Sequence, residues 1–369
     1  MKELRIKDIC DKGSSNLKQK DVEGKNGLYP VYGASGIISY IDTYHQEDNY
    51  IAIVKDGSGI GRVTFMPAKS SVIGTMQYIL PKDGFNINYI GYCLQSLDLS
   101  KYKQGAAIPH IYFRDYGERI VKVTADKNEQ QSIVGYLDSA FAKIDAMKAN
   151  AEKALNEAKA LFQASLKEML EPKKGWEEKK LSEVVNILNG YAFPSKAFGD
   201  NQELKVVKIT NVGVGSFIED ISTLPQKMFI QDVCLKEGDI VIALTRTIIS
   251  EGLKRAIIPS SYDGAMLNQR VASLRFSGKI NMSFLYYYLG CSIVSDYVWL
   301  HVNTLMQPNL SIKDLKSMPV CIPSLPEQQS IVATLDSLKS KVDRLRENYE
   351  KISQECDALK QAILRQVFE

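Results

Sequence analysis

The sequence predicts an α+β fold in which two globular regions are combined with two long helices. The chain has 369 residues, which is longer than one ordinary domain and suits about two. Apolar residues make up 45% and charged residues 24%, a balance typical of globular proteins that argues against extended disorder. One segment of about 40 residues occurs twice, so the chain is built from two related halves.

The repeated segment covers residues 129–171 and 327–369, without a gap and with roughly half of the positions identical. Both copies begin with the letters EQQSIV. A weaker match precedes them, in which Pro109–Tyr116 parallels Pro308–Leu315. Further upstream the halves diverge, which predicts two different regions mounted on two copies of one frame.

Both repeated segments predict a long helix. Apolar residues recur at alternating steps of four and three, with polar residues between them and no proline inside either run. Pro172 and Gly175 end the first helix, and Pro326 suits the first turn of the second. The predicted seam of the first helix is Ile133, Leu137, Ala140, Ile144, Met147, Ala151, Ala154, Ala158 and Leu161. That of the second is Ile331, Leu335, Leu338, Val342, Leu345, Tyr349, Ile352, Cys356, Leu359 and Ile363.

The two seams differ in size, which favours pairing of the helices within one chain. Small residues such as Ala151 and Ala158 stand where the second seam has Tyr349 and Cys356. A helix of about 40 residues is roughly 60 Å long. Two other interpretations remain open: a coiled coil between two copies of the chain, and long helices buried in a core.

Short β-like runs separated by Gly, Asn, Asp and Pro fill the regions outside the repeated segments. Helices are predicted there over Asn88–Ser96 and Met282–Val298. The mixture predicts a compact α+β globule in each region, with a strand order that the sequence does not reveal. The predicted division is globular regions at 1–125 and 173–322 and long helices at 126–172 and 323–369.

Loops in the first globular region carry residues suited to nucleic acid. The stretch from Lys55 to Arg62 is a glycine-rich turn flanked by cations, and glycine lets backbone N–H groups approach phosphate closely. No GK[ST] follows, so this is not a Walker loop. A hairpin turn with surface charges explains the stretch equally well. The candidate contacts are Lys55, Ser58, Arg62, Lys101, Lys103 and Gln104.

Loops in the second globular region give a second set of candidates. Asn and Gln can bond adenine bidentately and Arg can bond guanine, so Asn268-Gln269-Arg270 is a base-reading candidate. The alternative is that Asn268 and Gln269 satisfy loop backbone inside the fold. The candidate contacts are Thr245, Arg246, Lys254, Arg255, Asn268, Gln269 and Arg270.

Catalytic patterns are missing from the sequence. It contains no Pro-Pro for the flipped-base pocket of an adenine methyltransferase, and no Walker A, GxSxG or HExxH pattern. Three histidines lie far apart, and six cysteines form no CxxC pair, which predicts no metal site and reduced thiols. With no apolar run of 18 residues and no signal-peptide pattern, we expect a cytoplasmic protein without a membrane span. These patterns favour a binding scaffold over an enzyme. The net charge of +3 leaves room for local basic patches.

At this point the residues resemble the specificity (S) subunits of type I restriction–modification systems. Ile322–Val332 is similar to that family's IPLPPLxEQxxIV junction, and Asn128–Val134 looks like a degenerate first copy without the prolines. Pro308–Leu315 resembles the family's PxLxxxDL entry into the junction, with Pro109–Tyr116 as a looser copy. Gly175-Trp176 resembles the start of a target recognition domain. The resemblance covers the whole chain.

The resemblance implies two globular target recognition domains joined by two long helices that form an antiparallel coiled coil. Each domain would read one half of an asymmetric split DNA sequence, and the helices would place the half-sites about one helical turn apart. The chain itself would be non-catalytic and hold no cofactor. Two modification (methyltransferase) subunits with S-adenosylmethionine would methylate adenine at N6. Two restriction (translocase/endonuclease) subunits would use ATP and Mg²⁺.

Two other classes of function remain open. One is a protein–protein scaffold, or a regulatory DNA-binding protein without a methyltransferase partner. The other is an enzyme with an unrecognised site. Strong salt-dependent binding to double-stranded DNA separates the specificity-subunit interpretation from a pure scaffold. Binding of S-adenosylmethionine by the isolated chain would support an enzyme.

Overall fold

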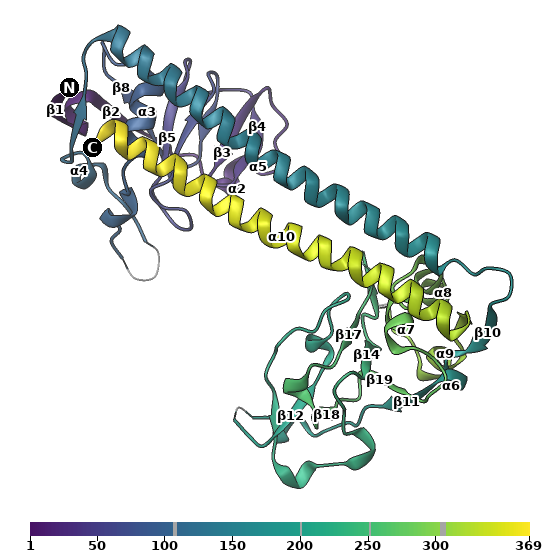
Figure 1. The fold of residues 1–369 in the computed structure, drawn as a ribbon. Coiled ribbons are helices and arrows are strands. Elements are labelled where there is room, and N and C mark those ends of the chain that lie inside the picture. The colour runs from purple at the N-terminus through teal and green to yellow at the C-terminus, as the bar shows by residue number, and fades with distance from the viewer. Residues whose placement is uncertain (106–108, 200, 251, 303–307) are drawn as a thin grey trace. The chain divides into compact units, whose positions relative to one another are not determined.

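The computed structural model describes residues 1–105, 109–199, 201–250, 252–302 and 308–369. The chain divides into two compact units. Unit 1 comprises Met1–Lys153 with Glu347–Glu369, and unit 2 comprises Ala154–Arg346. Because the boundaries fall inside the two long helices, each unit contains an α/β region and part of both helices (Figure 1). The long helices are α5, Lys127–Leu170, and α10, Leu325–Phe368.

The α/β region of unit 1 is built on an antiparallel sheet of order β2-β8-β5-β6. Strand β5 is buried along its whole length, as its apolar sequence requires. In a smaller sheet of order β4-β3-β7, β3 runs antiparallel to β4 and parallel to β7. The strands are β1 Lys2–Arg5, β2 Cys10–Ser14, β3 Tyr29–Gly33, β4 Gly36–Ile41, β5 Tyr50–Val54, β6 Val63–Met66, β7 Ser71–Val72, β8 Met76–Pro81 and β9 Ile120–Val123. The short helices are α1 Ile6–Ile9, α2 Gln19–Val22, α3 Ile87–Gln95, η1 Leu99–Tyr102 and α4 Phe113–Tyr116.

Unit 2 contains the same two sheets in the same order, β11-β19-β14-β17 and β13-β12-β18, and β12 again runs parallel to β18. Its main strands are β10 Glu177–Lys180, β11 Val185–Asn189, β12 Leu204–Val207, β13 Thr223–Leu224, β14 Ile240–Ala243, β17 Arg255–Ile257, β18 Met266–Leu267, β19 Val271–Phe276 and β20 Pro319–Ile322. A small hairpin joins β15 Ile248–Ile249 to β16 Gly252–Leu253. The helices are α6 Leu181–Val184, α7 Met282–Tyr288, α8 Ser292–His301 and α9 Ile312–Ser317, with 3-10 turns η2 Ser195–Ala197, η3 Ile209–Asn211, η4 Gln226–Met228, η5 Gln231–Val233 and η6 Ser260–Tyr262. The structural repeat therefore extends through the regions whose sequences diverge.

The helix predicted over Met282–Val298 is instead two helices, α7 and α8, so this prediction was wrong. The buried guanidinium of Arg255 causes the break. Its Nε donates to the carbonyl oxygen of Tyr286 at 3.0 Å and so satisfies a carbonyl in the last turn of α7. Gly290 makes room for it, because a Cβ at this position would lie 2.0 Å from Arg255 Nη2. The helix predicted over Asn88–Ser96 corresponds to α3, which is capped by the side chain of Asn86.

In each unit the two long helices lie side by side and run antiparallel (Figure 1). In unit 1, Lys360 Nζ lies 2.5 Å from Asp145 Oδ1, and Lys148 Nζ lies 3.5 Å from Asp357 Oδ1. Residue numbers rise along α5 while they fall along α10, which confirms the antiparallel arrangement. In unit 2 the two helices contribute Leu166, Leu170, Ile331 and Leu335 to one apolar core.

Most predicted seam residues lie on a buried stripe of their helix, but four, including Ala154, are exposed and do not. The other three are Met147, Leu161 and Leu359, which are 58%, 59% and 47% exposed. All four were wrongly assigned to the seam. The fully buried members of the predicted seam are Leu137, Ile144, Ile331, Leu335, Val342 and Cys356. The half-buried members are Ile133, Ala140, Ala151, Ala158, Leu338, Leu345, Tyr349, Ile352 and Ile363.

The period of the buried stripe explains these errors. In α5 the buried residues Ile144, Leu155 and Leu166 are eleven positions apart. That spacing corresponds to about 3.7 residues per turn, longer than the 3.5 of a heptad. The stripe consequently drifts by one residue, and Leu155 and not the exposed Ala154 faces inward.

The first glutamine of each EQQSIV copy, Gln130 or Gln328, joins its long helix to the α/β region of the same unit. We call this set of hydrogen bonds the clasp. Gln130 Oε1 accepts from the backbone N–H of Asn86 at 2.7 Å, and Gln328 Oε1 accepts from that of Asn281 at 2.8 Å. Each asparagine caps the next helix, α3 or α7. The Gln130 amide also donates to Thr124 O at 3.0 Å, as the Gln328 amide does to a carbonyl at 2.8 Å. Both glutamines are buried, so the clasps are shielded from water.

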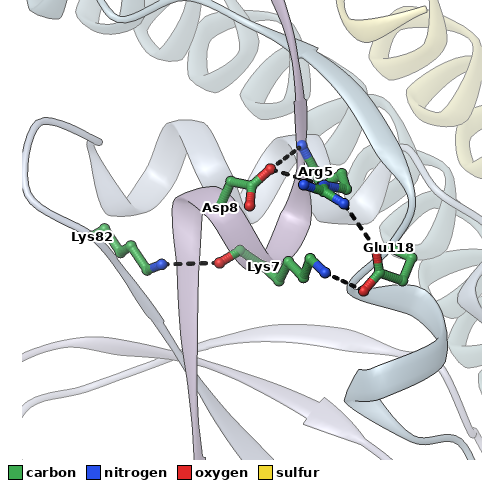
Figure 2. Close-up of polar contacts among 5 residues, drawn as sticks. All are labelled: Arg5, Lys7, Asp8, Lys82 and Glu118. Atoms are coloured by element: carbon green, nitrogen blue, oxygen red, sulfur yellow. Dashed lines mark hydrogen bonds and ion pairs between the residues drawn. The ribbon is translucent and has the colours of Figure 1, made fainter.

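A network of polar side chains holds the short helix α1 of unit 1 (Figure 2). The Arg5 side chain donates to Asp8 Oδ2 at 3.1 Å and to Glu118 Oε2 at 3.4 Å, and Lys7 also pairs with Glu118. Lys82 Nζ donates to the carbonyl oxygen of Lys7 at 2.9 Å. Hydrogen bonds and nearby cations lower the pKa of both the Asp8 and the Glu118 carboxyl groups.

Candidate nucleic-acid interface

In unit 2 the ends of several strands bring most of the predicted contacts together. The N–H of Leu244, which follows β14, donates to Arg270 O at 2.9 Å, so the 245–246 loop lies beside the 268–270 turn. Lys254 N donates to Thr247 O at 2.8 Å. Tyr191, which follows β11, accepts from Gln269 N at 2.9 Å. We call Thr245, Arg246, Lys254, Asn268, Gln269, Arg270 and Tyr191 the unit 2 edge.

Arg246 is the most unusual residue of this edge. Its φ of 50° lies in the left-handed region, which is costly for a residue with a side chain. The loop that holds it is fastened by Thr247 N to Pro308 O at 2.9 Å and by Leu310 N to Leu244 O at 3.0 Å. In the corresponding loop of unit 1 the left-handed residue is Gly57, with a φ of 79°. An exposed arginine held where glycine would be unstrained is a good candidate for a contact residue.

Lys254 is half-buried behind Arg246. Burial, and next the positive charge of Arg246, lower the pKa of the Lys254 ammonium. Its Nζ donates to the carbonyl oxygen of Ile209 at 3.2 Å. The edge therefore concentrates positive charge, which favours an anionic partner such as a phosphate backbone.

The turn before β19 is held by main-chain bonds. Asn268 N donates to Val207 O at 3.0 Å, and a Cβ at Gly190 would lie 1.9 Å from Asn268 O. Asn268 is half-buried, whereas Gln269 and Arg270 are exposed. Gln269 and Arg270 therefore have the freer side chains of the three.

Arg255 is not available to nucleic acid, so its prediction as a contact was wrong. Only 9% of the residue is exposed, its Nε is used by Tyr286 O, and its guanidinium carbon lies 4.9 Å from the centre of the Tyr286 ring. Its side chain points to the opposite face of β17 from the core that contains Ala256. Sequence proximity to Lys254 suggested a basic pair, but alternation along a strand sends adjacent side chains to opposite faces.

In unit 1 the candidates separate into two groups. Lys55 N donates to Thr75 O at 3.0 Å, as Leu244 does to Arg270 in unit 2. Gln104 and His110 exchange backbone hydrogen bonds of 2.8 and 2.9 Å, and Ile111 N donates to Lys55 O at 2.9 Å. Lys55 and Gln104 thus lie at the edge that corresponds to the unit 2 edge.

Charge at the unit 1 edge is partly neutralised. Lys55 Nζ lies 4.0 Å from Asp56 Oδ2, and Asp56 also pairs with His110. Burial, followed by the charge of Lys55, lowers the pKa of His110. Gln104 Nε2 donates to Asp115 Oδ2 at 3.0 Å.

The second group of unit 1 lies towards the long helices. Arg62 lines a cavity of about 930 Å³ together with Asp145 and Lys360. Lys101 pairs with Asp98 at 3.8 Å and lines an adjacent cavity. Ser58 and Lys103 are exposed on the loops between these groups. The glycine-rich turn is a β5–β6 hairpin closed by Gly61 N to Val54 O at 2.8 Å.

Two residues of these edges were missed by sequence reasoning. Tyr191 is 48% exposed, and its ring packs edgewise on Phe193 with centroids 5.1 Å apart. Thr75 is the counterpart of Arg270 in unit 1. The sequence did not reveal Tyr191 and Thr75 because their place at an edge depends on strand pairing. A residue can be assigned to an edge only when its strand is known to end there.

Neither a metal site nor a membrane span is found in the described part of the chain. No group of three or more His, Cys, Asp or Glu side chains there is placed to hold a metal ion. No helix within the same ranges is long and apolar enough to cross a membrane.

Comparison with known proteins shows which family the chain resembles. The family model for the type I restriction modification DNA specificity domain matches residues 1–157 and 173–354. The chain is 29% identical over 383 aligned positions to the MjaVIII specificity subunit of Methanocaldococcus jannaschii, covering 94% of this chain and 87% of that protein. It is 32% identical over 184 positions to the EcoAI specificity subunit of Escherichia coli, covering 47% of this chain and 30% of that protein.

Solved structures share the fold. One, from work on complex assembly and conformational transition of the type I R-M system, superposes with a TM-score of 0.73 at 17% identity, covering 98% of this chain and 96% of that one. The HsdS subunit from Thermoanaerobacter tengcongensis gives a TM-score of 0.53 at 17% identity, covering 98% and 95%. Since the family model matches both halves, the chain belongs to the family of type I restriction–modification specificity subunits.

Proposed function

We propose that the chain is the sequence-specific DNA-recognition subunit of a type I restriction–modification complex and performs no catalysis itself. Residues 1–125 and 173–322 act as target recognition domains, and residues 126–172 and 323–369 act as spacer helices. One observation carries the proposal: two α/β regions of identical strand order end in edges with different side chains. Such an arrangement suits two readers of different sequence held on one frame.

In this proposal the unit 2 edge reads one half of a split target. Arg246, Gln269 and Arg270 have the donors and acceptors that read base edges, and Lys254 adds charge towards the backbone. In unit 1, Lys55, Ser58, Lys103 and Gln104 serve the other half. Because the two edges differ in sequence, the target is asymmetric.

The two long helices set the unread gap between the half-sites. Two modification subunits, which bind S-adenosylmethionine, dock on the two related halves and methylate adenine. Two restriction subunits bring ATP and Mg²⁺ chemistry. The complex works in the cytoplasm.

The test is a single-molecule methylation map of the source cell's DNA with and without this gene. We expect one bipartite motif, with methyladenine in both halves across a fixed gap, to disappear when the gene is deleted. If the map is unchanged while active modification subunits still co-purify with the chain, the proposal is wrong.

A second measurement addresses the scaffold alternative. Binding of the assembled complex to duplex DNA that contains the mapped motif should weaken steeply between 50 and 200 mM salt, because phosphate contacts release counterions. Absence of salt-dependent binding would favour a pure protein–protein scaffold.

A further inference from the structure

Unit 2 contains a cavity of about 340 Å³ with an unusual charge in its wall. It lies among β17, α7 and the parts of α5 and α10 that belong to unit 2. Its size is within the range of small-molecule sites, about 300–1,000 Å³. Cations from three elements line it: Lys159, Arg255, Lys339 and Arg346.

Arg255 is the central residue of this cavity. It is more than nine-tenths buried, and among the described residues it has no carboxylate partner. Among the described residues its side chain donates one hydrogen bond, from Nε to Tyr286 O, and the guanidinium lies over the Tyr286 ring. A buried guanidinium without a counter-ion is costly, because desolvation is not repaid by a partner charge.

The corresponding position of unit 1 shows that the fold does not require this arginine. Val63 pairs with Ile53 in unit 1 just as Arg255 pairs with Ile242 in unit 2. An aliphatic side chain therefore suits the strand. The arginine, with Gly290 opposite it, is a feature of unit 2 alone.

The other charged side chains that line the cavity leave it with a net positive charge. Asp343 is its one acidic lining residue among those described, and it pairs with Lys339 at 3.3 Å. Lys159 and Arg346 add two further positive charges. Phe162, Tyr286 and Tyr287 supply aromatic surface.

We propose that this cavity binds a small organic anion, in which a phosphate or carboxylate group meets Arg255 and an aromatic or apolar body packs on Phe162 and the tyrosines. A guanidinium fork matches either group bidentately. The site is distinct from the unit 2 edge, and its test does not depend on the proposed DNA recognition.

The test is isothermal titration of the full chain with phenyl phosphate, benzoate, inorganic phosphate and phenol. We expect saturable binding of phenyl phosphate or benzoate that is at least tenfold tighter than that of inorganic phosphate or phenol. The preferred probe then tells whether the natural ligand carries phosphate or carboxylate. Absence of saturable binding by both aromatic anions up to 10 mM would overturn the proposal.

Variants locate the site. Lys159→Ala with Arg346→Ala should weaken binding of the preferred anion at least fivefold without unfolding, because both residues are exposed on helices. Arg255→Lys should weaken binding at least tenfold, and its fold is checked by circular dichroism because Arg255 also caps α7. Arg62→Ala, in the corresponding cavity of unit 1, is the matched control and should leave the affinity unchanged. Equal loss in the control and the double variant would show non-specific attraction and reject the site.

Discussion

The two units share their attachment to the long helices but differ at the edges of their sheets. In both, a buried glutamine joins α5 or α10 to the capping asparagine of the next helix. In both, a tyrosine hydroxyl donates to an aspartate of the long helix at 2.5 Å, Tyr92 to Asp138 and Tyr287 to Asp336. The edges, by contrast, present Lys55 and Gln104 in one unit and Arg246 and Gln269 in the other. Attachment is thus conserved within the molecule, while the surface assigned to recognition varies.

The contacts between the helices also show one exchange. In unit 1, Lys360 of α10 lies 5.4 Å from the ring centre of Phe141 in α5. In the repeat, Phe141 of α5 corresponds to Lys339 of α10, and Lys360 of α10 corresponds to Phe162 of α5. The two positions have therefore exchanged residue types, while in both units the ring is on α5 and the cation is on α10.

The largest effect should come from lengthening the two long helices, α5 and α10. Inserting seven residues into both helices, after Lys153 and after Arg346, adds about 10 Å to each. That corresponds to about three base pairs of DNA. We expect modification at the native gap to fall at least 100-fold and a longer gap to be accepted with the half-sites unchanged. A methylation map of the variant complex measures the gap preference. If that preference is unchanged, the two long helices do not set the gap.

The clasps should matter equally in the two units. Gln130→Leu and Gln328→Leu each leave buried backbone groups unpaired, which should lower the free energy of unfolding by about 2–4 kcal/mol. The neighbouring Gln131→Leu and Gln329→Leu, at exposed positions, are matched controls and should change it by less than about 1 kcal/mol. Urea denaturation provides the measurement. A large loss in one unit only would break the equivalence of the two clasps.

Recognition should be separable by unit. Arg246→Ala or Gln269→Ala should weaken binding to targets that carry the native second half-site by about 10–100-fold, because a bidentate base contact discriminates by about 1–3 kcal/mol. Competition with targets altered in one half-site or the other provides the measurement. Lys227→Ala, an exposed lysine outside the unit 2 edge, serves as the control. Loss of discrimination at the first half-site in a folded variant would contradict the modular interpretation.

The smallest effect concerns acid stability of unit 1. Asp8 and Glu118 have a lowered pKa in the folded chain, so their stabilising contribution is present above the usual carboxyl range near 4 and is lost as pH falls through the folded pKa. Glu118→Gln should therefore be less stable than the wild type at pH 7, with the difference shrinking by pH 3. Urea denaturation at pH 7, 4 and 3 measures this, with Glu3→Gln as the control for losing one exposed charge. A difference that is independent of pH would show that the network does not act through ionisation.

The two long helices and the internal repeat could be predicted because they depend on local sequence patterns. Helix-forming runs without proline located α5 and α10, and the repeat implied two copies. The heptad pattern failed at Met147, Leu161 and Leu359 because the stripe drifts with the true period of the helix. The single helix expected over Met282–Val298 failed because Arg255, distant in sequence, caps it from a neighbouring strand.

The candidate interface was predictable only in part. Residue type pointed to Arg246, Gln269 and Lys55, but their grouping depends on strand pairing. Arg255 looked equivalent to Lys254 until the pairing of β17 with β14 placed it on the buried face. Tyr191 and Thr75 carry no sequence signal of their own and join the edges only through hydrogen bonds to partners far along the chain.

The discontinuity of unit 1 has a consequence for the order of folding. Leu364 and Phe368 complete its apolar core, and the Phe368 ring lies 5.3 Å from that of Tyr89. Contacts between residues so distant in sequence form late and slowly. During synthesis, unit 2 can assemble from the continuous stretch 154–346. Residues 1–153 of unit 1 are made first, but the core of that unit is completed only when the last turn of α10 has been made.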